Sequence, residues 1–144
     1  MQIWNRRPDL ERLNNPPHPH MGVWLDIQFI KVEDDALHAR MPVNDRTRQP
    51  MGILHGGASV VLAETVGSVA SWYVIDPEMN VTVGMEINAN HLRPVKDGYV
   101  TAVCKPVHIG RSSHVWDVRL FDDLNRPVCI SRLTVAVVEK QRFN

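Results

Sequence analysis

Cysteine is nearly missing from this chain of 144 residues, with only Cys104 and Cys129 present. The two residues stand far apart in valine-rich segments, which excludes the paired spacing of a zinc site and the dense pattern of a secreted disulfide scaffold. We expect two buried free thiols. His18 and His20 could form a metal pair, but the prolines around them favour a surface loop, so no metal site is predicted.

Long apolar runs are also missing. No strictly apolar run reaches 18 residues, which excludes an ordinary transmembrane helix. The first seven residues, MQIWNRR, lack the apolar stretch of a secretory signal. We therefore expect a cytoplasmic protein that does not bind a membrane.

Neither sign of charge is in excess, because 16 Lys and Arg balance 16 Asp and Glu. A nucleic-acid-binding protein usually has a basic surplus, so nucleic acid is not an expected partner. The balance is uneven along the chain: residues 1–90 carry seven basic and eleven acidic side chains, and residues 91–144 carry nine and five. The C-terminal part could therefore bind an anion.

The length and the 44% hydrophobic content predict one globular domain over residues 1–144. The longest predicted element is a buried helix over residues 58–73, which is apolar almost all round. A short helix is expected at residues 8–13. The strands are expected at residues 22–31, 36–42, 81–88, 99–109, 113–121 and 127–138. This order predicts an α+β protein in which a meandering antiparallel sheet wraps around one long central helix.

The first strand after the long helix shows a clear period of two. Val81, Val83, Met85 and Ile87 alternate with polar or smaller residues. The alternation predicts that these four side chains share one face of the sheet.

Glu64 is the strongest chemical signal, because it is the only formally charged residue between positions 49 and 75. Carboxylates are almost never fully buried unless they are paired or used chemically. No basic residue stands one helical turn away, at positions 60, 61, 67 or 68. Glu64 could instead reach solvent or pair with a distant arginine. Ser68 lies four residues later on the same helical face and could hold a water or the carboxylate.

The start of the helix gives a second signal, His55 followed by Gly56 and Gly57. The first turn of a helix has unpaired backbone N–H groups and partial positive charge. Glycine permits close approach, so this turn could stabilise an oxyanion or polarise a carbonyl. Two glycines before a helix can also be only a turn.

The spacing of the two signals predicts a dimer. Gly56 and Glu64 are eight residues apart, which is roughly 12 Å along a helix. Both cannot contact one reacting carbonyl within one chain, so two subunits related by a two-fold axis would share two identical sites.

Three segments carry a family resemblance: residues 49–64, residues 84–94, and residues 108–111 ahead of Val115 and Trp116. Together they resemble the hotdog-fold acyl-CoA thioesterases of the 4-hydroxybenzoyl-CoA and 1,4-dihydroxy-2-naphthoyl-CoA types, which include the enterobactin-proofreading thioesterases. The resemblance extends from Trp4 to Val138 and implies a hotdog fold.

The resemblance implies roles for individual residues. Glu64 matches the catalytic carboxylate, which acts as a nucleophile or as a general base on water. Gly56 matches the residue whose N–H polarises the thioester carbonyl, and Ser68 the residue that positions the attacking water. Gln49 and His55 match polar residues near the thioester and the leaving group. Substrate and coenzyme A binding is expected from Arg93, His108, Arg111, Ser112, His91 and Met51.

Met51 departs from the family pattern, because close relatives often have Phe at this position beside the acyl pocket.

The resemblance predicts a thioester hydrolase that acts on an aromatic acyl-CoA as a homodimer or a dimer of dimers. It needs no cofactor, since coenzyme A belongs to the substrate. One alternative is a hotdog enoyl-CoA hydratase or dehydratase. A second is a thioesterase for aliphatic acyl-CoA or acyl-carrier-protein esters, and a third is a protein that binds acyl-CoA without hydrolysis.

Overall fold

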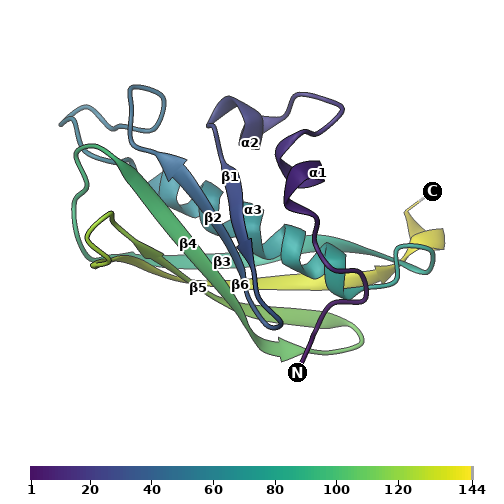
Figure 1. The fold of residues 1–144 in the computed structure, drawn as a ribbon. Helices are drawn as coiled ribbons and strands as arrows, with labels where there is room; N and C mark the ends of the chain where they lie inside the picture. The colour runs from purple at the N-terminus through teal and green to yellow at the C-terminus, as the bar shows by residue number, and fades with distance from the viewer. Residues whose placement is uncertain (144) are drawn as a thin grey trace.

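The computed structural model describes residues 1–143 as a six-stranded antiparallel sheet curled around one long helix (Figure 1). The predicted α+β class and its central helix are confirmed. The elements in chain order are α1 (Leu10–Asn14), α2 (Met21–Trp24), β1 (Gln28–Val32), β2 (Leu37–Pro42), α3 (Gly56–Val74), β3 (Asn80–His91), β4 (Tyr99–Ile109), β5 (Ser113–Phe121), β6 (Pro127–Glu139) and the 3-10 turn Lys140–Arg142.

The order of strands across the sheet is β1-β2-β4-β5-β6-β3. The last four strands were predicted to follow one another as a meander, but only β4, β5 and β6 do so. Strand β3 instead pairs with β6 along its whole length. The reason is that α3 crosses the inner face of the sheet and delivers the chain to its far side (Figure 1). As a result, β3 is an edge strand of twelve residues.

The predicted strand at residues 22–31 is only partly correct, because α2 occupies its first residues. The Gly22 N–H donates to Nδ1 of His20 at 3.1 Å, which caps this short helix. Asp26 then takes a left-handed backbone conformation with φ of 56°, and the chain turns into β1. The predicted helix at residues 8–13 begins slightly later, because Asp9 is its N-cap.

The predicted single face of β3 is wrong because the strand contains a β-bulge. Gly84 pairs with Val135 and Glu86 pairs with Thr134, so Met85 is an extra residue without a partner. The bulge shifts the alternation by one position, and Met85 is 68% exposed. Gly84 faces the helix before the bulge, where Val83 is exposed, and Ile87 and Ala89 pack against the core after it.

The core lies between the inner face of the sheet and one side of α3. The predicted alternation of β2 is confirmed, since Leu37, Ala39 and Met41 are fully buried. The two cysteines are free and buried as predicted. Burial raises the pKa of both thiols, so they remain protonated near neutral pH.

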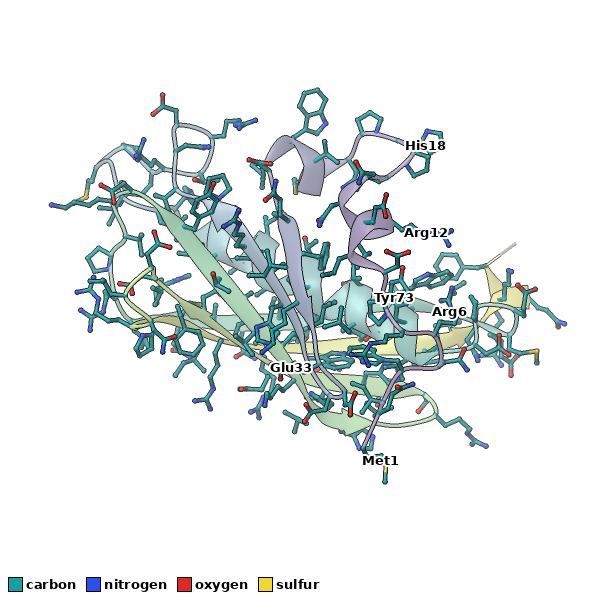
Figure 2. The ribbon with its side chains drawn as sticks, in the orientation of Figure 1. Met1, Arg6, Arg12, His18, Glu33 and Tyr73 are labelled. Atoms are coloured by element: carbon teal, nitrogen blue, oxygen red, sulfur yellow. The ribbon has the colours of Figure 1, made fainter. Side chains whose placement is uncertain are left out.

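The N-terminal segment fastens the C-terminal end of α3. Backbone N–H groups of Asn5 and Arg6 donate to the Tyr73 carbonyl, and the Arg6 guanidinium donates to the Trp72 carbonyl at 2.9 Å. The guanidinium also lies 5.5 Å from the ring of Trp72 and 5.3 Å from that of Tyr73. Figure 2 shows Arg6 beside Tyr73. A cation here binds one of the last carbonyls of the helix and complements the helix dipole.

A buried polar cluster ties α3 to β5. The indole N–H of Trp116 donates to Oγ of Ser71 at 2.7 Å, and Nδ1 of His114 lies 3.1 Å from the same oxygen. His114 is 1% exposed. Burial is the main cause that lowers the pKa of His114, and the nearby His108 lowers it further.

We expect stability to fall as the pH drops below about 6.5, the ordinary pKa of histidine. The unfolded chain binds a proton there that the folded His114 resists, so the free energy of unfolding rises with pH. A substitution His114→Asn keeps a polar group near Ser71 but does not titrate. The melting temperature between pH 5.5 and 7.5 should therefore depend less on pH in this variant than in the wild type. An equal dependence would show that His114 is not the group responsible.

Candidate active site

The first turn of α3 has one free backbone donor. His55 is the N-cap, and its Nδ1 accepts the Gly57 N–H at 2.8 Å. The His55 carbonyl accepts the N–H groups of Ala58 and Ser59. Within residues 1–143, the Gly56 N–H has no hydrogen-bond partner. The expectation that both glycines leave their N–H groups bare is thus wrong for Gly57, because the imidazole caps it.

This cap fixes how His55 can act. Because Nδ1 accepts a hydrogen bond, the neutral ring carries its proton on Nε2. The exposed His55 side chain is therefore a helix cap, and it is not among the residues that line the neighbouring groove.

A groove of about 480 Å³ opens beside this helix terminus. Gly56 and the buried Ser59 supply the helix side of the groove. His91 and Arg93 line it from the end of β3, and the His91 ring lies against Gly56, with Nε2 2.8 Å from where a β-carbon would stand. The remaining lining is Gln49 and the apolar side chains of Ile53, Leu54, Leu92, Pro94 and Val128.

Gln49 is held by the loop that precedes α3. Its Oε1 accepts the Met51 N–H, and its backbone N–H donates to the Ile53 carbonyl at 2.8 Å. The amide nitrogen has no acceptor within residues 1–143, and Gln49 lines the groove. Met51 is 83% exposed and does not line the groove.

Glu64 lies two turns further along α3 and is half-buried in the single chain, although the apolar residues around it predict a buried helix. One stripe of the helix is left partly uncovered in the single chain, and Glu64 and Ser68 both lie on it, between Val60 and Trp72. The Glu64 carboxylate lies against Gly84 of β3. No basic side chain forms an ion pair with it among the described residues.

The helix is continuous from Gly56 to Val74, so its rise keeps the Gly56 N–H and the Glu64 backbone about 12 Å apart. The free donor and the carboxylate therefore do not form a single site in one chain.

The predicted anion-binding residues are divided between the two ends of β3. Arg93 is in the groove next to the end at His91. Arg111 and Ser112 line a second hollow beside Asn80, which is at the other end of β3. The two ends of the strand are about 36 Å apart. The exposed His108 ring packs over Gly110 near this hollow.

Several residues of these surfaces were not among those predicted from the sequence. Lys140 and Arg142 line the second hollow beside Arg111. Ser59 could have been found, since it lies one turn from Gly56 on the predicted helix. Gly84 could have been noticed as a glycine inside a run of strand-forming residues.

Among residues 1–143, no three His, Cys, Asp or Glu side chains are grouped closely enough to hold a metal ion. Figure 2 shows His18 on the outside of the segment that joins α1 to α2, residues 15–20. The neighbouring His20 caps α2. In the same range, no helix has the length and hydropathy needed to cross a bilayer.

Residues 51–129 match the thioesterase superfamily, which is more than half of the chain. A 1,4-dihydroxy-2-naphthoyl-CoA hydrolase of Escherichia coli is 51% identical over 136 residues, covering 94% of this chain and 99% of the relative. A proofreading thioesterase, EntH of Cronobacter turicensis, is 45% identical over 94% of this chain and 98% of its own. The chain therefore belongs to the thioesterase superfamily, a family of thioester hydrolases.

Solved structures agree with the fold. A mutant of thioesterase PA1618 from Pseudomonas aeruginosa superposes with a TM-score of 0.94 at 51% identity, covering 96% of this chain and 99% of that one. Thioesterase HI1161 from Haemophilus influenzae has a TM-score of 0.92 at 41% identity and covers 96% of each chain. The hotdog fold predicted from the three sequence segments is confirmed.

Proposed function

We propose that this protein hydrolyses the thioester of an aromatic acyl-CoA. The observation that carries the proposal is the free N–H of Gly56, a residue that lines a groove with a largely apolar lining. A donor at a helix terminus stabilises the negative charge that develops on the carbonyl oxygen during attack.

Glu64 supplies the other half of the chemistry. As a general base, its carboxylate takes a proton from water while the water oxygen forms a bond to the carbonyl carbon. As a nucleophile, the carboxylate oxygen forms that bond and water then hydrolyses the acyl-enzyme. In both routes the carbon–sulfur bond breaks. The leaving thiolate takes the proton that Glu64 removed from water in the first route and a proton from solvent in the second. Ser68, one turn from Glu64, would position the water.

Two subunits would complete each site through the free edge of β3. A long unpaired edge strand is a template for pairing with another strand. The helix stripe that carries Glu64 adjoins β3, since the carboxylate lies against Gly84. A two-fold axis level with Val60 would place Gly56 opposite Glu64 of the partner subunit. A further pairing of dimers stays a prediction.

The same arrangement would join the two anion-binding ends. In an antiparallel pair of β3 strands, the Asn80 end of one strand lies beside the His91 end of the other. The partner subunit's Arg111 and Ser112 would then approach the Arg93 groove from across the interface. Guanidinium groups bind phosphate in bidentate geometry, as the phosphates of coenzyme A require.

An aromatic acyl group is favoured by two features. The groove presents five apolar side chains, and one relative of 51% identity is named as a hydrolase of an aryl-CoA ester, 1,4-dihydroxy-2-naphthoyl-CoA.

Release of free thiol from a panel of coenzyme A esters tests this proposal. We expect benzoyl- or naphthoyl-type esters to give kcat/KM at least about tenfold above aliphatic esters, since each tenfold step corresponds to about 1.4 kcal/mol of transition-state binding. A higher kcat/KM for a long aliphatic ester, or for an acyl group on a carrier protein, would show that an aromatic acyl-CoA is not the preferred substrate.

Two arms of the panel test the reaction itself. Hydration of an enoyl-CoA without thiol release would identify a hydratase. Tight binding of every ester without thiol release would identify a binding protein.

A further inference from the structure

Gly84 is the point at which the edge strand meets the carboxylate of Glu64. A β-carbon built on Gly84 would lie 2.7 Å from Oε1 of Glu64, which is closer than real β-carbons approach an oxygen. Gly84 faces the helix just before the bulge at Met85, and Ile87 and Ala89 pack against the core after the bulge.

The backbone does not require glycine at this position. The glycines with positive φ in residues 1–143 are Gly52 and Gly98, so Gly84 has a conformation that alanine can adopt. Glycine within a strand is also slightly destabilising relative to alanine. What glycine provides here is space, and the atom that fills the space is a carboxylate oxygen.

We propose that Gly84 is a positioning residue that sets where the Glu64 carboxylate stands relative to the reacting carbonyl. This inference rests on the proposed role of Glu64. An added methyl group would move Oε1 by about 0.7 Å to restore an ordinary contact of 3.4 Å. The carboxylate is the free end of a flexible side chain, so it can move without disturbing the fold.

The variant Gly84→Ala tests the proposal. Since misplacement by about 1 Å can cost about 100-fold in rate, we expect kcat for thiol release to fall about 10- to 100-fold. KM should stay within about threefold, because the groove at Gly56 is not altered. Val83→Ala is the matched control, since it changes a neighbouring side chain on the opposite face of β3; its kcat should stay within about threefold of the wild type.

Pairing Gly84→Ala with changes at Glu64 separates positioning from a general effect on β3. In the Glu64→Ala background no carboxylate remains to be displaced, so adding Gly84→Ala should leave the residual rate unchanged within about threefold. In the Glu64→Asp background the shorter side chain relieves the contact with residue 84. Adding Gly84→Ala should therefore lower kcat by less than about threefold in that background.

Each outcome decides between the claims. Full activity of Gly84→Ala, or an equal loss in all three backgrounds, overturns the positioning role. Full activity of Glu64→Ala instead overturns the proposed function itself. If Gly84→Ala lowers the melting temperature and Glu64→Asp does not restore it, the contact is not the cause and the inference is wrong.

Discussion

Replacing Glu64 by Gln is expected to lower kcat for thiol release by about 10³-fold while the protein stays folded. The amide has nearly the same shape but can neither accept a proton from water nor attack the thioester, and general-base catalysis typically contributes about 10²- to 10⁴-fold. Glu64 is half-buried and has no ion pair among residues 1–143, so its neutralisation removes no structural salt bridge.

Glu86→Gln is the matched control for this variant. Glu86 follows the bulge on the exposed side of β3, where its carboxylate accepts from Asn88. Its removal changes the net charge by the same amount without touching the helix. We expect near wild-type kcat for Glu86→Gln and equal melting temperatures for both variants. Retention of full hydrolysis by Glu64→Gln would exclude the carboxylate from the reaction.

The elements with an unbroken period could be predicted from the sequence. The bounds predicted for β4 and β5 agree with the structure, and α3 extends the predicted helix by two residues at its start and one at its end. In each of these segments the alternation or the apolar run continues to a turn that contains Gly, Asp or Asn, so local sequence determines both the element and its limits.

The structural features that were not predicted from the sequence depend mainly on pairing between distant segments. The bulge at Met85 is defined by which residues of β6 lie opposite, and the sequence of β3 alone does not contain that register. The neighbour of β3 could not be predicted for the same reason. A helix of four residues such as α2 is too short to show a period, and its capping by His20 depends on a side-chain rotamer.

Three residues of the candidate site lie together in the structure, and their roles stay predictions. Gly56, Gln49 and His91 line one groove. The apolar sequence of α3 predicts a buried helix, but Glu64 is only half-buried in the single chain, because burial of the uncovered stripe of α3 depends on what lies against that stripe. The cap formed by His55 could not be foreseen, since an imidazole can cap a helix or face a ligand.

Replacing Gly56 by Pro is expected to remove the free donor and nothing else from the backbone. Gly56 is the first residue of α3, a position that favours proline. The preceding His55 has ψ of 129°, the extended conformation that precedes proline readily. Loss of one oxyanion donor typically costs about 10²- to 10³-fold in kcat, and we expect that loss for thiol release.

Gly56→Ala is the control, because it adds a β-carbon beside His91 and keeps the N–H. The His91 ring is the end of a side chain that can rotate away, so kcat of the alanine variant should fall less than about tenfold. The additional fall in kcat of the proline variant then measures the loss of the N–H donor. Equal loss in the two variants would attribute the effect to His91.

Mixing the two inactive variants then tests whether one site is built from two chains. In a hybrid of one Gly56→Pro chain and one Glu64→Gln chain, one site pairs an intact N–H with an intact carboxylate, and the other has lost both. Random exchange gives about half hybrids, each with one working site, so about a quarter of wild-type activity should return. A site contained within one chain predicts no recovery, even when native mass spectrometry shows that the hybrids have formed. Recovery would also show which groups form a site together, since the Gly56 N–H of one subunit must then act with the Glu64 carboxylate of the other.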